Sequence, residues 1–428
     1  MEFPLTSRAQ ALSWFHQTLA ALDPARLLRQ RLQAAPPLDG YRQIAVLAFG
    51  KAAPGMLSAW LAAAPGRGAR PDAVEAWLSA PAGAPAAARP AGARIHAFVG
   101  GHPEPNPASL AAGAAMLAAV HRLAASPEPA LLVALVSGGG SALVEVPLEN
   151  GLVEAQSLHR ALVASGAPIA EINLIRKRRS AFKGGRLAAA AAGPQVDQVT
   201  WILSDVAGDD WAAVASGPTF PDASTAADYQ AAWRRWLPHL PFAPAPQPPQ
   251  PGDPAFARSA WHCLAANRDA TALFADLAAA AGYAPVVVAT DADEAEEPIA
   301  AQHLAARWRA LRAAHLRPAL IAGGEVRVRL PARHGRGGRN QLLALRLATL
   351  LAGHDFVFLS AGTDGVDGSS HAAGALVDGG TLARARAAGL DPARHLADFD
   401  PDPLLAATGD LVVTGPTGNN LRDLRLFL

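Results

Sequence analysis

The residues that could do chemistry gather in glycine-rich turns, and the densest group lies between Gly323 and Asp378. This stretch contains Gly-Gly-Glu at 323–325, Arg-Gly-Gly-Arg-Asn-Gln at 336–341 and Ser-Ala-Gly-Thr-Asp-Gly-Val-Asp-Gly at 360–368. Arginine, asparagine and aspartate are the side chains that bind phosphate, magnesium and hydroxyl groups. Glycine is needed because turns that aim successive N–H groups at an anion demand a positive φ or a close backbone approach. We therefore expect a site here.

Similar turns occur in the first half of the chain. Gly50-Lys51-Ala-Ala-Pro-Gly55 and Ser137-Gly-Gly-Gly-Ser141 each follow an apolar run. The second turn is a candidate anion nest; its alternative, a flexible linker, would rarely follow so apolar a strand. Ser204-Asp205 ends a third such run, where the aspartate suits metal coordination or hydroxyl activation but could equally be a helix-capping or turn residue.

Lysine occurs only at positions 51, 177 and 183, among 37 lysines and arginines. A retained lysine hints that a compact, mobile ammonium is needed, although three could also remain by chance. Lys177 and Lys183 lie in the basic segment 171–192, for which a solvated face and nucleic-acid binding are the routine interpretations. Because Phe182 is its only aromatic residue, we favour a local basic wall for a small polyanionic ligand.

His102 lies in the turn Gly100-Gly-His-Pro-Glu-Pro-Asn-Pro107. Three prolines fix the backbone of this turn, so its polar side chains could be held at the edge of a site. A lone loop histidine is, however, more often satisfied by neighbouring backbone groups.

Several familiar catalytic motifs do not occur in the sequence. Gly50 to Gly55 has the glycine spacing of a Walker A loop but is followed by Met-Leu. There is no Gly-x-Gly-x-x-Gly fingerprint opening a βα turn, no zinc signature and no Gly-x-Ser-x-Gly elbow. What remains is a set of cations and N–H groups for phosphates, with carboxylates for magnesium and a hydroxyl. That inventory is the one that phosphoryl transfer requires.

The elements that must position these turns alternate between strand and helix patterns. Apolar runs that precede the turns occupy residues 43–49, 130–136, 199–203, 319–322 and 356–360. A β-type run is also expected at 325–330, and a helix interrupted by a double glycine at 171–192. Ligands bind at the carboxyl ends of strands in open α/β sheets. We predict an α/β fold of two three-layer α/β/α domains with largely parallel or mixed sheets and an active-site cleft between the domains.

The length of 428 residues and the hydrophobic content of 51% suffice for two or three domains with their own cores. Residues 237–254 are dense in proline and almost free of charge, which is typical of a polyproline-type linker. We predict an N-terminal Rossmann-like domain over 1–240, a linker over 241–254 and a C-terminal α/β domain over 255–428.

The charge and cysteine content limit the kinds of partner that the protein can have. With a net charge of +1, the protein as a whole does not attract nucleic acid or an anionic membrane surface. The single cysteine, Cys263, excludes an internal disulfide framework and fits a reducing compartment. Neither a signal peptide nor a membrane span is readable. We expect a cytoplasmic enzyme acting on small molecules, for which a homodimer is compatible with the sequence.

Taken in order along nearly the whole chain, these motifs resemble the ATP-dependent glycerate 2-kinases of the MOFRL type, which often carry the older label hydroxypyruvate reductase. The resemblance is carried by Gly50-Lys51-Ala-Ala, Gly101-His-Pro, Ser137-Gly-Gly-Gly-Ser-Ala-Leu143, Arg176-Lys177, Lys183-Gly-Gly-Arg-Leu-Ala188, Ser204-Asp-Val-Ala-Gly-Asp209, Ser216-Gly-Pro-Thr219, Gly323-Gly-Glu325, Gly335-Arg-Gly-Gly-Arg-Asn-Gln341, Gly362-Thr-Asp-Gly-Val-Asp-Gly368 and Thr414-Gly-Pro-Thr-Gly418. It implies a DUF4147-like domain before a MOFRL domain, with ATP and Mg²⁺ as cofactors. The implied reaction transfers the ATP γ-phosphate to the 2-hydroxyl of D-glycerate.

The resemblance also implies roles by position. Lys51 would contact the transferring phosphate with Arg336 or Arg339 as its partner, and Asp205 and Asp364 would serve the metal or the hydroxyl. ATP would be bound by Ser137, Gly138, Gly139, Gly140, Ser141, Lys177, Lys183, Gly184, Asn340 and Thr363, and glycerate by His102, Arg176, Glu325 and Asp364. One alternative is an NAD(P)H-dependent hydroxypyruvate reductase, which fits the α/β pattern but lacks a dinucleotide fingerprint. Another is a non-catalytic module that binds sugar acids.

Overall fold

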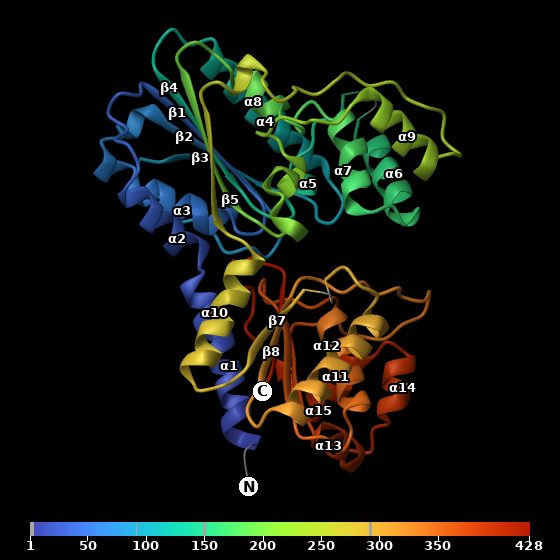
Figure 1. Ribbon diagram of the computed structural model, residues 1–428. Coiled ribbons are helices and arrows are strands. Elements are labelled where there is room, and N and C mark those ends of the chain that lie inside the picture. The colour runs from blue at the N-terminus through green and yellow to red at the C-terminus, as the bar shows by residue number, and fades with distance from the viewer. Residues whose placement is uncertain (1–3, 91, 149–150, 291–292) are drawn as a thin grey trace. The chain divides into compact units, whose positions relative to one another are not determined.

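The computed structural model describes residues 4–90, 92–148, 151–290 and 293–428 and divides into two compact units. One unit is Pro24–Leu264; the other joins the residues up to Asp23 with Ala265–Leu428. Each unit contains a six-stranded sheet with helices on both faces (Figure 1). The predicted α/β class, with parallel and mixed sheets between helices, is therefore confirmed.

The sheet of the first unit is built from apolar runs. Its strands are β1 (Gln43–Phe49), β2 (Val74–Ala80), β3 (Arg94–Val99), β4 (Ala130–Val136), β5 (Val196–Leu203) and β6 (Ser259–Ala265), in the order β3-β2-β1-β4-β5-β6. Strands β1 to β5 are parallel to one another. Every residue of β4 is buried, as expected for a parallel strand that is covered on both faces.

Helices cover both faces of this sheet (Figure 1). Helices α2 (Pro24–Gln33) and α3 (Ala53–Ala63) lie on one face, and α4 (Pro107–Ala124) and α8 (Arg186–Ala191) on the other. The apolar core under α4 and α8 includes Leu47, Met116 and Leu132. Helices α6 (Gly151–Ala164), α7 (Ile169–Arg178) and α9 (Ala226–Trp236) form a lobe with its own small core, which includes Leu162, Ile175 and Trp233.

The sheet of the second unit is mixed. Its strands are β7 (Val286–Ala289), β8 (Ala319–Gly323), β9 (Val357–Gly362), β10 (Gly374–Asp378), β11 (Leu411–Val412) and β12 (Asp423–Phe427), in the order β11-β10-β9-β12-β8-β7. β7 and β8 pair in parallel, whereas β12 runs antiparallel to both β8 and β9. β8 and β9 therefore point the same way on either side of β12.

Helices also cover both faces of the second sheet. Helices α1 (Pro4–Ala21) and α10 (Asn267–Ala280) lie on one face, and α11 (Glu297–Ala314) and α12 (Arg339–Leu350) on the other. The short helices α13 (Thr381–Ala387), α14 (Pro392–Ala397) and α15 (Pro401–Ala407) pack near α12. No helix of the described residues is both long and apolar enough to span a membrane.

The compact units differ from the predicted domains 1–240, 241–254 and 255–428 at both ends of the first domain. The N-terminal helix α1 belongs to the second unit, because Arg8 forms ion pairs with Asp378 (2.5 Å) and Asp410 (2.8 Å) of that unit. The chain leaves the first unit only at Leu264, after β6 has joined its sheet.

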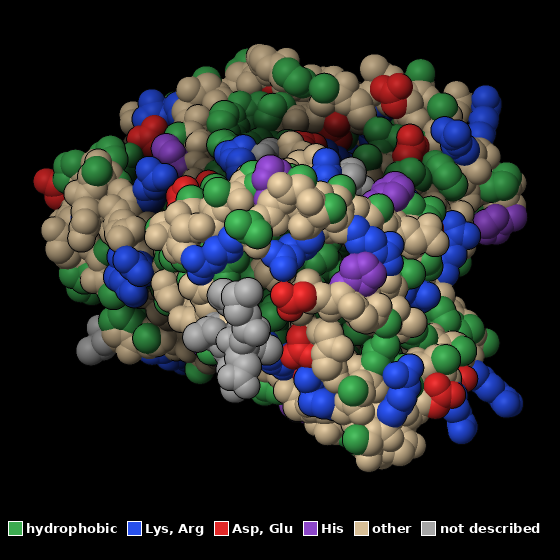
Figure 2. All heavy atoms as spheres, turned by 60° about the horizontal axis from the view of Figure 1, so that its bottom comes forward, with side chains coloured by type: hydrophobic (Ala, Val, Ile, Leu, Met, Phe, Trp, Pro, Cys, Tyr) green, Lys and Arg blue, Asp and Glu red, His purple; other side chains and the backbone are tan. Residues whose placement is uncertain are grey.

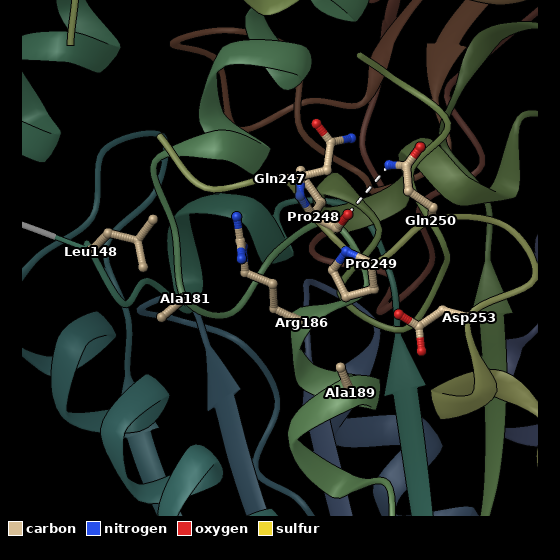
Figure 3. A pocket seen from close by; sticks show the side chains of 9 residues that line it. All are labelled: Leu148, Ala181, Arg186, Ala189, Gln247, Pro248, Pro249, Gln250 and Asp253. Carbon is tan, nitrogen blue, oxygen red and sulfur yellow. Dashed lines mark hydrogen bonds between the residues drawn. The ribbon is translucent and has the colours of Figure 1, made fainter. Parts of the chain in front are cut away.

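The proline-dense stretch 241–254, predicted as a linker, is packed onto the first unit. Its carbonyl groups, which have no partner strand, accept hydrogen bonds from Arg186 Nη2 (to Pro246, 2.7 Å) and from the Asp222 N–H (to Pro249, 2.9 Å). Figure 3 shows Arg186 reaching toward this stretch, at a cavity of about 570 Å³. Extended proline-rich backbone offers unpaired carbonyl groups, so these contacts hold it against α8.

One local prediction needs correction. The β-type run 325–330 forms no strand; its ordered contact is an isolated bridge between Arg327 and Glu296. The predicted interruption of the helix over 171–192 is confirmed: α7 ends at Arg178, and α8 begins at Arg186 directly after Gly184 and Gly185, which adopt φ angles of 58° and 78°.

Candidate active site

The carboxyl ends of β1 and β4 meet in the first unit, where the strand order reverses. β2 lies at one edge of β1 and β4 at the other, so the chain switches direction across this point. Open α/β sheets bind ligands at such a switch point. The two turns that follow these strands are joined: the Lys51 N–H donates to the Gly138 carbonyl (2.9 Å), and the Ala52 N–H donates to Ser137 Oγ (3.0 Å).

Two glycines in these turns are required by their surroundings. Gly50 has a φ of +124°, and a Cβ there would lie 2.2 Å from Ser137 Oγ. Gly139 has a φ of +82°, and a Cβ there would lie 3.1 Å from His102 Cδ2 and 3.5 Å from Lys51 Cγ. The structure therefore brings the side chains of Lys51 and His102 against the backbone of the predicted anion nest.

Ser141 connects this nest to helix α7. Its Oγ shares a hydrogen bond of 2.7 Å with Ser216 Oγ, which donates to Asn173 Oδ1 (2.9 Å). Arg176 Nη2 donates to the Ser141 carbonyl (2.7 Å). Arg176, predicted to bind glycerate, thus fixes the nest itself, and it does so together with Asn173, to which the sequence analysis gave no role.

Lys183, a predicted ATP ligand, is completely buried and pairs with the carboxylate of Glu145. Glu145 also accepts a hydrogen bond from Ser180 Oγ (2.7 Å) and lies 3.7 Å from Arg176 Nη2. Burial alone would raise the pKa of Glu145, but the charges of Lys183 and Arg176 hold it below its usual value. This geometry gives Lys183 a structural role, and a direct contact with ATP would require it to leave Glu145.

The predicted basic wall along 171–192 is divided between two carboxylates. Arg176 and Lys183 face Glu145, whereas Lys177 Nζ lies 3.9 Å from Asp222 Oδ2. A Cβ at Gly184 would lie 3.1 Å from Lys177 Cβ, so this glycine lets the lysine approach the backbone. These cations therefore do not form an uncompensated positive surface.

Asp205 follows the end of β5 and is partly exposed. β5 pairs in parallel with β4, with Ile202 opposite Val136, so Asp205 lies at the same sheet edge as the nest. Its position suits either a metal ligand or a group that orients a hydroxyl.

The second unit has its own polar edge. The first residues of β12 pair with Gly323, at the end of β8, and with Gly362, at the end of β9. Glu325, Asp364 and Asp423 consequently come to the same edge of the sheet, although they lie far apart in the sequence.

The two arginines of the predicted turn have different surroundings. Arg339 donates two hydrogen bonds to the carboxylate of Asp423, from Nε (2.6 Å) and from Nη2 (3.0 Å). Its Nη2 also lies 2.8 Å from Glu325 Oε1. Burial opposes its charge, but Asp423 and Glu325 outweigh burial and raise the pKa of Arg339. Arg336 is exposed, and its Nη2 lies 3.6 Å from Asp402. Arg339 is therefore fixed in place, while Arg336 can reach a ligand.

Asp367 caps the first turn of α12, a role that the sequence analysis did not assign. Its carboxylate accepts hydrogen bonds from the backbone N–H groups of Asn340 (3.1 Å) and Gln341 (2.9 Å). Burial, together with the negative charge of Asp423, raises the pKa of Asp367 to about 7. The signal in the sequence was the second aspartate of the Asp-Gly-Val-Asp-Gly motif.

Two predicted ATP ligands of this unit are buried. Asn340 Oδ1 accepts a hydrogen bond from Ser360 Oγ (2.6 Å). Thr363 Oγ1 donates to the Arg422 carbonyl (2.8 Å) and accepts from the Leu421 N–H (2.7 Å). Both side chains are used in hydrogen bonds within the protein. If Asn340 or Thr363 contacts ATP, it would therefore do so through its backbone.

Charge on the surface is mixed. On the face shown in Figure 2, Lys and Arg side chains are dispersed among acidic, histidine and apolar ones. This distribution agrees with the net charge of +1. Recognition of an anion must therefore rest on the local turns described above rather than on a broad field.

Comparisons with known proteins agree with this geometry. A family model described as a domain of unknown function, DUF4147, matches residues 10–241, and the MOFRL family matches residues 318–423. A protein of Agrobacterium vitis with the provisional name hydroxypyruvate reductase is 40% identical over 350 residues, covering 79% of this chain and 78% of its own. The D-glycerate 2-kinase of Thermotoga maritima is 37% identical over 339 residues, with coverages of 77% and 79%.

A solved structure extends the likeness to the whole chain. The crystal structure of glycerate kinase from Thermotoga maritima matches with a TM-score of 0.83 at 30% identity, covering 99% of this chain and 100% of that one. The DUF4147 match alone spans more than half of the 428 residues. This chain belongs to the family of proteins that join a DUF4147 domain to a MOFRL domain, the family that includes the glycerate kinases.

Proposed function

We propose that this protein is a glycerate kinase that transfers the γ-phosphoryl group of ATP to the 2-hydroxyl of D-glycerate, giving 2-phosphoglycerate and ADP. The observation that carries the proposal is the pair of joined glycine turns after β1 and β4, with Lys51 and His102 against Gly139. The kinase names of relatives that match most of the chain support it.

Phosphoryl transfer depends on positioning and on neutralising charge, with little covalent work for the protein. In the first unit, the backbone of Ser137–Ser141 would cradle phosphate oxygens, because its glycines leave the N–H groups open to close approach. Lys51 would place its ammonium against the transferring phosphate, where charge grows in the transition state. His102 would border the glycerate.

In the second unit, Arg336 is the better candidate for contacting the transferring phosphate. Its guanidinium is exposed, whereas the charge of Arg339 is already matched by Asp423 and Glu325. Arg339 would then act as a positioning residue for the Arg-Gly-Gly-Arg turn. The predicted cleft between the two domains stays a prediction.

Magnesium would be held by few protein ligands. Among the described residues, no group of three or more His, Cys, Asp and Glu side chains could hold a metal ion. Mg²⁺ bound with a nucleotide usually takes one or two carboxylates, with water and phosphate oxygens completing its six positions. Asp205 and Asp364, which are both partly exposed, fit that donor set. The ion would neutralise charge on the phosphates when bound.

The reaction is tested with the full-length chain, ATP, Mg²⁺ and D-glycerate. We expect ADP to form only when glycerate is present and to stop when magnesium is chelated. A phosphorus NMR spectrum of the product distinguishes the 2-phosphate from the 3-phosphate, which differ only in the hydroxyl that faces the donor. No ADP formation with D-glycerate would rule the proposal out.

The names of two Agrobacterium vitis relatives favour one alternative, an NAD(P)H-dependent hydroxypyruvate reductase. The turn after β1, however, reads Gly50-Lys51-Ala-Ala and lacks the dinucleotide fingerprint. Oxidation of NADH or NADPH upon addition of hydroxypyruvate would support the reductase. We expect none above the rate without enzyme.

A cytoplasmic location is part of this proposal, since a single cysteine and the absence of a disulfide framework suit a reducing compartment. A homodimer is the assembly we would test first. Cell fractionation and light scattering of the purified protein examine these two points separately.

A further inference from the structure

The first unit contains a cavity of about 640 Å³ that none of these roles uses. Its floor is one face of the sheet, formed by Leu131 and Val133 of β4, Val199 and Trp201 of β5 and His262 of β6. This is the face on which α2 and α3 lie, since residues of both helices line the cavity. A volume of this size falls within the range of small-molecule sites, roughly 300–1,000 Å³.

The walls of the cavity are unusually aromatic. Four of the nine tryptophans of the chain border it, namely Trp60, Trp201, Trp211 and Trp261, although the ring of Trp261 itself stacks on Phe220 on the other face of the sheet. The rings of Trp201 and His262 are stacked, with centroids 4.5 Å apart and planes at 26°. Aromatic walls of this kind offer flat surfaces on which another ring can stack. The shape and composition therefore favour a planar aromatic ligand.

The charged residues that line the cavity are predominantly positive. Arg31, Arg67 and Arg258 line it, against the single carboxylate of Asp197. Asp197 is already occupied, because Arg258 Nη2 (2.8 Å) and Tyr41 Oη (2.7 Å) both bind it. Two guanidinium groups therefore remain in excess, and an anionic group on the ligand would be attracted.

Two neighbouring groups bear on the character of the ligand. Burial, and to a lesser extent Arg31, lower the pKa of His262, so the excess positive charge of the cavity comes from the arginines and not from this ring. The Nε1 of Trp211 is buried without a hydrogen-bond partner among the described residues. A buried donor without a partner is costly, and an acceptor oxygen on a ligand would satisfy it.

We propose that this cavity binds a planar aromatic anion, such as an aryl sulfonate or aryl carboxylate. The site is distinct from the proposed active site, because it is lined by Leu131 and Asp197, near the first residues of β4 and β5. The glycine turns follow the last residues of those strands. The proposal therefore does not depend on the kinase assignment.

The test uses the full-length protein and naphthalene-2-sulfonate as the probe, followed by isothermal titration calorimetry. We expect saturable binding of one probe per chain. The uncharged analogue 2-naphthalenemethanol should bind at least about tenfold more weakly, because it has no negative charge to interact with the arginines. Cyclohexanesulfonate should also bind weakly, because its ring is not aromatic and cannot stack. Absence of saturable binding by naphthalene-2-sulfonate would overturn the proposal.

The single cysteine gives an independent measure of location. Cys263 lines the cavity and is the only cysteine in the chain, so one iodoacetamide adduct in a mass spectrum reports on this position alone. Saturating probe should slow the alkylation of Cys263 at least about fivefold. An unchanged rate, with binding seen by calorimetry, would place the probe elsewhere and contradict the proposal.

Variants separate the two features of the site. Ala260→Trp fills the cavity and should abolish probe binding, with circular dichroism showing that the fold is retained. Arg31→Ala should weaken naphthalene-2-sulfonate several-fold and leave the uncharged analogue unaffected. Arg29→Ala, an equally exposed arginine of the same helix that does not line the cavity, is the matched control and should change neither. Equal effects of the two arginine variants, or full binding by a folded Ala260→Trp protein, would refute the proposal.

Discussion

Arg339 holds the carboxylate of Asp423 at two points, with Nε 2.6 Å from Oδ2 and Nη2 3.0 Å from Oδ1. Arg339 is the first residue of α12, and Asp423 is the first residue of β12 and is completely buried. The pair therefore ties the start of a helix to the centre of the second sheet. Glu325, at the end of β8, completes the group.

Replacing Arg339 by Ala should destabilise the second unit. The change leaves the buried Asp423 carboxylate without its two-point partner, and breaking such a pair costs a few kcal/mol. We expect about 1–3 kcal/mol, because Arg339 is one-third exposed and Arg425 lies 3.5 Å from the same carboxylate. Urea unfolding measures the loss.

Arg336→Ala is the matched control for stability within the same turn. Its side chain is exposed, so the free energy of unfolding should change by less than about 0.5 kcal/mol. If Arg336 contacts the transferring phosphate, glycerate phosphorylation should nevertheless fall roughly 10²-fold. Equal stability losses in the two variants would contradict the different roles assigned to these arginines.

Lys51→Ala should lower kcat about 10²-fold or more. The reason is that an ammonium against the transferring phosphate acts mainly in the transition state, so its removal affects kcat and kcat/KM alike. Lys51→Arg keeps the charge but presents a planar group, so it should restore activity only in part. Steady-state ADP formation provides the measurement, and wild-type turnover by Lys51→Ala would remove this lysine from the mechanism.

The buried pair of Glu145 and Lys183 predicts strong coupling between the two positions. Glu145→Gln alone leaves a completely buried ammonium without a carboxylate and should cost about 3–5 kcal/mol. Lys183→Met alone should also be costly, because Glu145 then keeps one cation, Arg176 at 3.7 Å, beside its hydrogen bond from Ser180. The double variant should be more stable than Glu145→Gln, since neither buried charge is left. Additive losses in a double-mutant cycle would show that the pair is not coupled.

Gly50→Ala tests the junction of β1 and β4. A methyl group there would lie 2.2 Å from Ser137 Oγ and 2.5 Å from the Ser137 carbonyl oxygen, and the φ of +124° disfavours any L side chain. We expect a loss of several kcal/mol or an insoluble protein. Gly40→Ala in the same unit is the control, because a Cβ there meets nothing within 4 Å. Thermal unfolding of both variants gives the comparison.

The two central strands of the first sheet could be predicted closely from the sequence, because buried parallel strands read as continuous apolar runs. Gln43–Phe49 and Ala130–Val136 coincide with the predicted ranges, whereas β5 begins three residues before the predicted run 199–203. The glycine turns after them could be located for the same reason. β12 was not predicted, although its backbone joins β8 to β9 and brings the second polar edge together.

The partners of the candidate site residues could not be predicted, because no local pattern specifies them. Asp423 lies 84 positions from Arg339 in the sequence, and Glu145 lies 38 positions from Lys183. Arg8 pairs with Asp378 across 370 positions, which is why the first helix joins the second unit. Such pairs are set by topology, so a lone charged residue in the sequence indicates neither its partner nor whether it is free to bind a ligand.

Asp367 should make the stability of the second unit depend on pH. Its folded pKa is raised to about 7, against an ordinary value of 3.8. Below pH 3.8 both states are protonated; between 3.8 and 7 only the folded chain holds the proton, so stability falls as pH rises, and above 7 the loss is complete. Over that range we expect the group to contribute a loss on the order of 4 kcal/mol.

Asp367→Asn removes this titration, so its urea midpoint should fall less than that of the wild type between pH 5 and pH 8. The comparison isolates Asp367 because every other titrating group is kept in the variant. Parallel pH profiles for the wild type and Asp367→Asn would mean that the carboxylate is ionised throughout, held by the N–H groups of Asn340 and Gln341 at the start of α12.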